Sequence, residues 1–499
     1  MAANQVLAYH RVAPRVYNLT GLRTGSVRDQ MLRAIMLTEA IYHDTDELKG
    51  SSPEPDDGIL VIGGGVAGVS CALIASKLNI NVTILEKNGI LFSTLLNANN
   101  RRIDPFEYDW PQPPVAVGTT FPRHLRFPLL YTGGTAAQVA HDWELQFKDW
   151  LRLRNPGIGS PGHVEVLWNT KAESYSYAIA IDPDSTDLIG VSDKRTSGST
   201  VRKYRALIIC AGVGGERTYD DASVPAYQYV GPGFWTFPDQ LETADFGLPP
   251  SGGTPRHILI SGGGDGAMQD LQRAATGKFG MDLLTELKTA LNLPDALEKE
   301  FARLLIADDR AKRAYAWKGD SGPRKALDGV MNEWHREFGL AVSAIFQAYA
   351  TANSMTDLSG NPDEAKAQRD LAGKLLRSEI LAGAKISWVF AESNPGYAYA
   401  LNRFLSDLIV KLLRAKSNHR VYRVQTKILN IAAVTSAPHT CGSALGCYGH
   451  IHDVTFSNTK NPEPFDIIII RHGIIPGEIA GLPFKAPVPE QLAPYDIPD

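Results

Sequence analysis

The sequence predicts an α/β fold in which one strand–turn–helix unit occurs twice along 499 residues. The first copy passes from an apolar strand at 59–62 through a glycine-rich turn at 63–68 into an apolar helix. The second copy repeats this pattern from a strand at 257–261 through a turn at 262–267. Each copy then continues through alternating strand-like segments and closes on a buried strand that ends in glycine. Two copies of one supersecondary pattern are hard to obtain by chance.

The first copy has the order of features expected of a dinucleotide-binding βαβ unit. Gly63 allows the tight turn, Gly65 lets the backbone approach a pyrophosphate, and Gly68 lets the helix pack closely on the strand. The helix N-terminus supplies N–H groups and a partial positive charge. The next strand, at 81–86, ends in Glu86, which would accept hydrogen bonds from a ribose.

The second copy has the G-x-G-x-x-A form of the same fingerprint, on Gly262, Gly264 and Ala267. Gly266 is a further glycine in this turn. Asp265 is unusual there, because a carboxylate would oppose a pyrophosphate. It could instead cap the following helix or bind a ligand amine.

With these motifs the chain resembles flavoproteins that have two dinucleotide-binding domains, the superfamily of pyridine-nucleotide disulfide reductases and flavin-containing monooxygenases. The resemblance covers roughly 58–275 and 385–475. It implies that the first fingerprint binds the ADP half of FAD and that the second binds NAD(P)H. It also implies that the strand ending in Gly212 leads back past the FAD site. The residues that match these motifs are Gly63, Gly65, Gly68 and Glu86 for FAD, and Gly262, Gly264 and Ala267 for the nicotinamide nucleotide.

Several residues that follow Glu86 in the sequence are further candidates for the FAD site. Lys87 adjoins the acid, and Arg101 and Arg102 could meet phosphate. Tyr108 or Trp110 could stack on a ring. The alternative is a loop that its aromatic side chains anchor by packing alone.

The last predicted strand ends in Arg471 and His472, at the edge of the sheet where ligands bind. Histidine carries protons at neutral pH, and arginine could hold a carboxylate or a flavin oxygen. These two residues and Trp110 are therefore the catalytic candidates. The alternative is a supporting role or simple solvent exposure.

The cysteines do not favour disulfide reduction, because Cys441 and Cys447 are separated by five residues instead of two or four. His439, His450 and His452 lie near them, but the cysteine spacing usual for zinc is missing. We therefore expect no metal site.

An insertion departs from the resemblance, because helical patterns fill 280–382 before the next strand at 384–393. On one of these helices Val330, Trp334 and Phe338 form an apolar stripe. The insertion could be a lid over the flavin or a surface for homo-oligomers, or it could have displaced nicotinamide binding.

The nucleotide preference stays open. Glu392, near the end of the delayed strand, favours NADH, whereas the Ala267 ending of the fingerprint is often associated with NADPH in this superfamily. Family members also have a Gly-Asp segment that holds the ribityl chain of FAD, and no such segment follows Gly473.

Composition indicates an ordinary globular protein. Apolar residues make up 44% of the chain and charged residues 21%, with a net charge of −4. This charge gives no electrostatic footprint for nucleic acid or an anionic membrane. Because the sequence shows neither a membrane-spanning apolar run nor a secretory signal, we expect a cytoplasmic protein.

The predicted organisation comprises five parts: an N-terminal helical arm and linker (1–57), an FAD-binding domain (58–250), an NAD(P)-binding-like domain (251–279 with 383–475), the helical insertion (280–382) and a tail (476–499). The predicted function is that of an FAD-dependent oxidoreductase, first of all an NAD(P)H-using monooxygenase of a small organic substrate. The alternatives are a flavin oxidase or dehydrogenase with the second domain as substrate lid, and a non-catalytic nucleotide-binding regulatory protein.

Overall fold

A computed structural model gives the fold and divides the chain into two compact units. Unit 1 comprises Met1–Pro105, Val115–Gly215 and Ile474–Asp499, and unit 2 comprises Phe106–Pro114 and Glu216–Gly473. The structure describes residues 3–19, 27–44, 58–111, 128–130, 132–179, 189–194, 201–212, 215–218, 229–235, 239–248, 255–316, 324–396, 399–417, 422–423, 425–433, 451–459 and 461–475.

Unit 1 contains a six-stranded sheet in the order β1-β2-β11-β3-β4-β7, parallel except for β1. In the register of this sheet Ile62 lies between Leu85 and Ile209, so β3, β4 and β11 end level with one another. The residues that follow these strands therefore meet at one edge. The strands are β1 (Arg11–Ala13), β2 (Val16–Asn18), β3 (Ile59–Ile62), β4 (Val82–Leu85), β7 (Val164–Leu167) and β11 (Ala206–Ile209).

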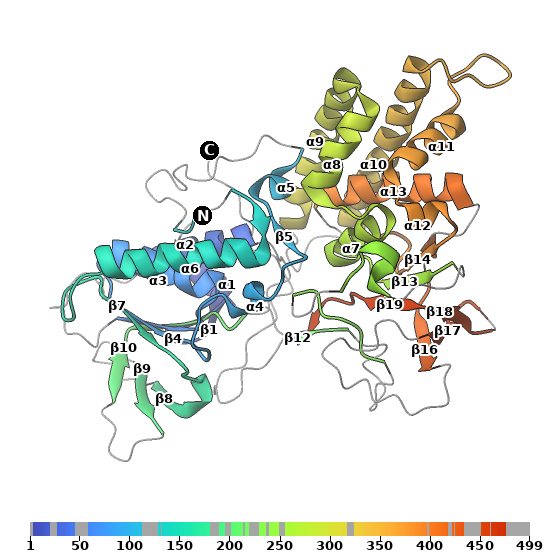
Figure 1. Ribbon diagram of the computed structural model, residues 1–499. Coiled ribbons are helices and arrows are strands. Elements are labelled where there is room, and N and C mark those ends of the chain that lie inside the picture. The colour runs from blue at the N-terminus through green and yellow to red at the C-terminus, as the bar shows by residue number, and fades with distance from the viewer. Residues whose placement is uncertain are drawn as a thin grey trace. The chain divides into compact units, whose positions relative to one another are not determined.

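Helices cover one face of this sheet and an antiparallel meander covers the other (Figure 1). The helices are α1 (Ala3–His10), α2 (Val27–Asp44), α3 (Val66–Lys77) and α6 (Ala136–Leu153), and the meander is β8 (Tyr175–Ile179), β9 (Ile189–Asp193) and β10 (Arg202–Tyr204). The N-terminal segment is more than the arm that the sequence predicts, because β2 pairs with β11 inside the sheet. The apolar residues of β2 are buried there.

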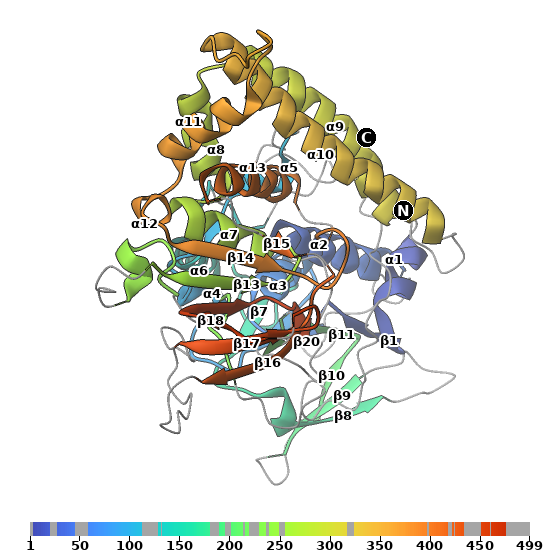
Figure 2. The same cartoon turned by 90° about the vertical axis from the view of Figure 1, so that its right-hand side faces the viewer.

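Unit 2 repeats this plan with a parallel sheet in the order β15-β14-β13-β19. A three-stranded meander covers one face of it and helices cover the other (Figure 2). The strands are β13 (His257–Ser261), β14 (Lys385–Val389), β15 (Tyr422–Arg423), β16 (Ile428–Ala433), β17 (His452–Phe456), β18 (Glu463–Phe465) and β19 (Ile467–Ile470). Read from the closing strand, the order β19-β13-β14-β15 corresponds strand by strand to β11-β3-β4-β7 of unit 1. The repeat that the sequence predicts is therefore present in the topology.

The insertion forms helices that pack into unit 2 itself. Trp334 and Phe338 are 1% and 0% exposed, in one apolar cluster with Ile258 and Ile260 of β13. The apolar stripe of this helix is thus buried in the core of its own unit. Neither a flavin nor a second copy of the chain is needed to cover the stripe. The helices of unit 2 are α7 (Asp265–Thr276), α8 (Gly280–Leu291), α9 (Pro294–Ala316), α10 (Arg324–Ala352), α11 (Glu364–Leu375), α12 (Ser378–Leu381) and α13 (Ala400–Ser417).

The segment before β13 also differs from the predicted division at 250/251. Tyr229 is fully buried in unit 2 against Ile468 and donates a hydrogen bond to the Ile468 carbonyl at 2.5 Å. This contact ties the segment to the second sheet. The short elements of the chain are α4 (Ser93–Leu96), β5 (Arg102–Ile103), α5 (Pro105–Asp109), β6 (Gly134–Thr135), β12 (Gly215–Glu216) and β20 (Ile474–Ile475), with 3-10 turns at Ala172–Ser174 and Ala244–Gly247.

None of the helices within the described ranges combines the length and the apolar character needed to cross a membrane.

Candidate functional site

Two of the three fingerprint glycines in unit 1 are required by the fold itself. Gly63 has a φ of +106°, and a Cβ there would lie 2.4 Å from the carbonyl oxygen of Cys210. A Cβ at Gly68 would lie 1.9 Å from the carbonyl oxygen of Gly63. The first position therefore lets the turn pass the end of β11, and the last lets α3 approach the strand.

Gly65 is different, because nothing in the described structure requires glycine there. Its φ is −81°, which any residue adopts, and a Cβ would meet no atom within 4 Å. Gly65 is the N-cap residue of α3, and no side chain caps this helix end. The first backbone N–H groups of the helix thus adjoin open space. This is the arrangement that binds phosphate groups.

Glu86 lies against the same turn, directly after β4. It is 6% exposed. Its Oε2 accepts a hydrogen bond from the Gly64 N–H at 2.6 Å, and its Oε1 accepts one from the Asn88 N–H at 2.8 Å. A carboxylate oxygen can accept two hydrogen bonds, so each oxygen keeps capacity for a ribose hydroxyl. Glu86 both supports the turn and offers a ligand contact.

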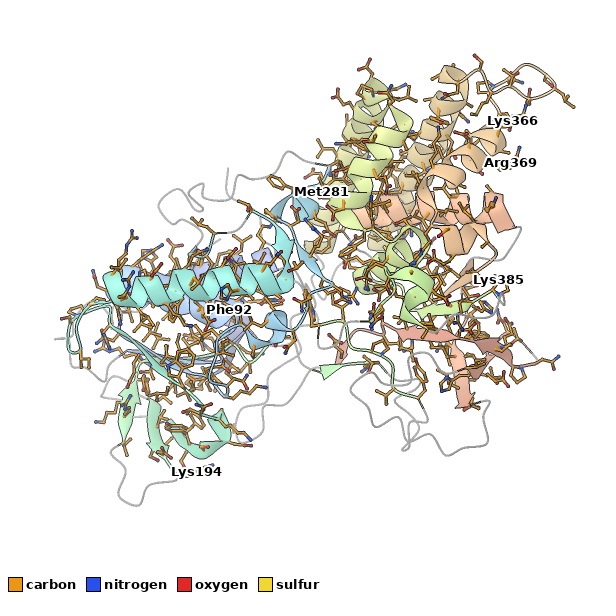
Figure 3. All side chains as sticks on the ribbon, in the orientation of Figure 1. Phe92, Lys194, Met281, Lys366, Arg369 and Lys385 are labelled. Carbon is orange, nitrogen blue, oxygen red and sulfur yellow. The ribbon has the colours of Figure 1, made fainter. Side chains whose placement is uncertain are left out.

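Phe92 closes the turn on its other side. Its backbone N–H donates to the Gly64 carbonyl at 3.1 Å, and its ring packs against Trp143 with a centroid distance of 5.7 Å. Figure 3 shows this side chain inside the body of unit 1, whereas the labelled Lys194 extends outward from the meander. The position of the turn is thus fixed by the core beneath it.

The other FAD candidates of unit 1 fit less well. Lys87 is exposed and Arg102 is partly buried. Arg101 is 1% exposed, and its carbonyl accepts the first N–H of α6 from Ala136. A phosphate ligand requires an accessible guanidinium, so burial argues against this role for Arg101. Gly212 is exposed and has a φ of +90°. It follows Cys210, the residue whose carbonyl lies against Gly63, by two residues.

Trp110 does not face a ligand. In unit 2 it is 7% exposed and belongs to the main apolar cluster. Its ring meets Phe301 edge-on at 4.8 Å and Phe404 at 5.3 Å. The structure thus corrects the catalytic hypothesis for Trp110 in favour of the packing alternative, because the aromatic helix residues around it bury the ring. Tyr108 has no described side chain.

The second turn repeats the backbone of the first. Gly262 has a φ of +135°, and a Cβ there would lie 2.2 Å from the carbonyl oxygen of Arg471, as Gly63 relates to Cys210. Gly264, the N-cap residue of α7, has a φ of −95° and no atom within 4 Å of a Cβ. A second uncapped helix end thus adjoins open space. At Gly266 a Cβ would instead touch the ring of Phe234 at 3.2 Å.

The ribose position of the second turn holds no acid. In the register of the two sheets Ser261 pairs with Val389 as Ile62 pairs with Leu85. Phe390 therefore occupies the place of Glu86, and it is 3% exposed. Glu392 lies two residues further along, exposed to solvent. The expectation that Glu392 stands at the ribose position is wrong, because strand β14 ends at Val389.

Asp265 does not cap its own helix. Its Oδ1 accepts hydrogen bonds from the Tyr399 N–H at 2.9 Å and from the side-chain amide of Asn402 at 2.7 Å. Tyr399 immediately precedes α13, so Asp265 caps that helix from the first turn of α7. Burial raises the pKa of Asp265 to about 6, although the two hydrogen bonds lower it.

Arg471 is held in a buried ion network. Its Nε donates to Asp270 at 2.8 Å, and its Nη1 donates to the Pro232 carbonyl at 2.6 Å. Arg273, fully buried, binds Asp270 at 2.7 Å and Asp239 at 2.6 Å and also contacts Glu242. Burial alone would lower the pKa of Arg273, but the three carboxylates raise it. The guanidinium of Arg471 is therefore engaged by Asp270 and Pro232, and its backbone lies against Gly262 of the turn. This supporting role differs from the predicted catalytic role of Arg471.

His472 bonds to a residue that sequence reasoning missed. Its Nε2 lies 2.8 Å from Oγ of Ser261, the last residue of β13. Ser261 is 3% exposed, and the His472 side chain is exposed. Ser261 directly precedes Gly262 in the sequence, and this position alone indicates that it lies at the ligand edge of the sheet. A hydroxyl in an apolar strand gives no other signal.

The cysteine–histidine loop lies outside the described residues at Cys441, Cys447, His439 and His450. Cys71 and Cys210 are free and buried. In the part of the chain that the structure describes, no group of three or more His, Cys, Asp or Glu residues could hold a metal ion.

Comparison with known proteins adds little at the level of sequence. No family model matches the chain, and no curated protein matches it. Among solved structures, a bacillithiol disulfide reductase from Staphylococcus aureus matches with 9% identity and a TM-score of 0.33, over 84% of this chain and 76% of that one. A thioredoxin reductase from Lactococcus lactis matches with 11% identity and a TM-score of 0.31, over 84% and 77%.

A flavin monooxygenase from Stenotrophomonas maltophilia matches with 14% identity and a TM-score of 0.26, over 44% of this chain and 54% of that one. Values this low carry no functional argument.

Proposed function

We propose that the protein is an FAD-dependent oxidoreductase in which the turn at 63–68 binds the ADP half of FAD. The observation that carries the proposal is Gly65. Neither its backbone angles nor its surroundings require glycine, yet a side chain there would fill the space in front of an uncapped helix end. A pyrophosphate accounts for that space, and Glu86 lies at the edge of the same turn to accept ribose hydroxyls.

Within this site each group of the protein has a separate task. The N–H groups at the start of α3 bind the pyrophosphate, and the partial positive charge of the helix end stabilises its negative charge. Glu86 holds the ribose while its bond to Gly64 keeps the turn rigid. FAD, when bound, supplies the redox chemistry, and the chain supplies binding and orientation.

We propose further that the turn at 262–267 binds NAD(P)H as electron donor and that the reaction is monooxygenation of a small organic substrate. Gly264 and the uncapped end of α7 support pyrophosphate binding there. Phe390 replaces the ribose acid, and its side chain is buried and has no hydrogen-bonding group. The ribose of this nucleotide therefore takes its hydrogen bonds from groups other than the residue after β14.

Two observations favour a second candidate, a flavin oxidase or dehydrogenase that takes hydride from its own substrate. Phe390 and the carboxylate of Asp265 both make the second turn less suited to a dinucleotide than the first. In this alternative the second domain serves as a substrate lid, and no nicotinamide donor is used.

Absorption spectroscopy of the purified protein tests the proposal and separates the candidates. We expect the two visible bands of oxidised flavin, and we expect them to bleach when NADH or NADPH is added without oxygen. Flavin that bleaches with neither nucleotide indicates the oxidase or dehydrogenase. A protein that cannot be loaded with FAD contradicts the proposal and leaves a regulatory nucleotide-binding protein.

A further inference from the structure

The bond between Ser261 and His472 joins two neighbouring strands at the ligand edge of the second sheet. Ser261 is the last residue of β13, and His472 follows β19 by two residues. Oγ and Nε2 are 2.8 Å apart. The serine is 3% exposed while the imidazole is exposed. A rigid, buried hydroxyl thus anchors a ring that reaches the surface.

The topology makes this location a ligand site by a separate argument. From β13 the chain passes through α7 and the helical insertion to β14 on one side, whereas β19 lies on the other side. Ligands of open α/β sheets bind in the crevice at such a point, outside the carboxyl ends of the strands. Gly264, with no atom within 4 Å of a Cβ, opens the same edge.

The polar pair is not needed by the fold. In the first repeat the equivalent positions are Ile62 and Ala211, an apolar residue and a methyl group. That sheet closes in the same register without a serine–histidine bond. The pair therefore calls for a local reason at the second turn.

We propose that protonated His472 binds the pyrophosphate of a dinucleotide at the turn 262–267 and that Ser261 is its positioning residue. The inference rests on the proposed function of this turn. A protonated imidazole adds a full positive charge beside the partial charge of the α7 N-terminus, and both attract an anion. The bond to Ser261 fixes the plane of the ring, so little rotational freedom is lost when the anion binds.

Other charged groups face the same edge and have to be separated from His472. Asp265 lies in the turn, and its raised pKa of about 6 means that it also becomes negative as pH rises. Arg471 precedes His472, and its guanidinium is bound to Asp270 at 2.8 Å. The backbone N–H of His472, not its ring, donates to the Arg217 carbonyl at 3.4 Å. Since Asp265 would weaken anion binding in the same pH direction, its charge has to be removed first.

A matched control exists at the opposite end of β13. Nε2 of His257 lies 3.0 Å from Oγ of Ser387, and its Nδ1 bonds to the Pro464 carbonyl at 3.1 Å. The bond is of the same kind, on the same sheet, but at the amino ends of the strands. Ligands do not bind at that edge.

The experiment titrates flavin-saturated protein with ADP-ribose by calorimetry between about pH 5.5 and pH 8, where histidine changes charge. All measurements use the Asp265→Asn variant as parent. We expect the affinity of the parent to fall about tenfold across this range, the effect of one charge-assisted hydrogen bond. The His472→Gln variant should bind ADP-ribose weakly at every pH. The Ser261→Ala variant should lose much of the increase in affinity at low pH, and Ser261→Thr should restore it.

The controls His257→Gln and Ser387→Ala should retain the parent's profile. A His472→Gln variant that keeps the pH profile of the parent overturns the inference and leaves the second turn as a nucleotide site. A parent that binds no ADP-ribose at any pH overturns both this inference and the nicotinamide assignment. In that case the visible flavin spectrum shows independently whether the first turn, at 63–68, binds FAD.

Discussion

The carboxylate of Asp265 accepts a hydrogen bond from the side-chain amide of Asn402 at 2.7 Å, and this bond joins the second glycine-rich turn to the start of α13. The two residues are separated in the chain by the whole helical insertion. The backbone N–H of Tyr399 strengthens the connection at 2.9 Å. The turn and the helix that follows the insertion are therefore held as one element.

Asp265→Asn should change how stability depends on pH. Burial raises the pKa of Asp265 in the folded protein from 3.8 to about 6. Between these values the folded state binds more protons, so its contribution to the free energy of unfolding falls as pH rises through this window. The amide does not ionise. We measure the free energy of unfolding with denaturant at the lower and at the upper end of this pH window. Relative to wild type, the variant should be more stable at the upper end than at the lower end by about 1–3 kcal/mol. A difference that does not vary with pH contradicts the argument.

Gly65→Asp should abolish FAD binding and leave the protein folded. The carboxylate would occupy the open space in front of α3 and repel the pyrophosphate, while no described atom lies within 4 Å of its Cβ. The ratio of visible to protein absorbance measures the loss. Gly264→Asp is the matched control, because it makes the same change in the second turn and should keep full flavin content. Normal flavin content in Gly65→Asp would refute the site.

Replacement of Glu86 should separate its two tasks. Glu86→Ala removes the ribose contact and the acceptor of the Gly64 N–H, so FAD affinity should fall by about 1–3 kcal/mol. Glu86→Gln keeps an oxygen for the turn but loses the charge, and its loss should be smaller. Fluorescence titration of apoprotein with FAD measures both. Unchanged affinity in Glu86→Ala would mean that the ribose lies elsewhere.

Trp334→Ala should destabilise unit 2 without changing flavin content. The indole is 1% exposed and donates to Asp308 at 3.2 Å, so truncation leaves a cavity that costs about 3–5 kcal/mol. Leu340→Ala on the same helix, where the leucine is 44% exposed, should shift the free energy of unfolding by less than about 0.5 kcal/mol. If instead peroxide release rose at unchanged stability, Trp334 would belong to a lid.

The sequence was most informative where backbone geometry depends on glycine. Gly63 and Gly262 have the positive φ that their motif predicts, and the two sheets repeat in the same order. Such positions are readable because only one residue type tolerates them. The prediction of helices between 280 and 382 also agrees with α8 to α12, since amphipathic spacing reports burial directly.

Side-chain partners were less predictable. Arg471 and Trp110 have residue types that suit ligands, but their contacts come from Asp270 and Phe301, which lie far away in sequence. No local pattern encodes such pairs. The predicted place of Glu392 differs from the observed one because sequence patterns give the end of a strand only to within a few residues. A difference of two residues puts Phe390 where the acid was expected.

The distance in sequence between β13 and β14 has a consequence for how the chain folds. These strands pair in parallel along their full length, yet about 120 residues separate them. Closing so long a loop has a large entropic barrier unless the intervening chain is already compact. The helices α9 and α10 pair locally and can form first, which shortens the effective loop. The protein should therefore acquire helical circular dichroism well before the amides of Ile258 and Ile386 in unit 2 become protected from hydrogen exchange.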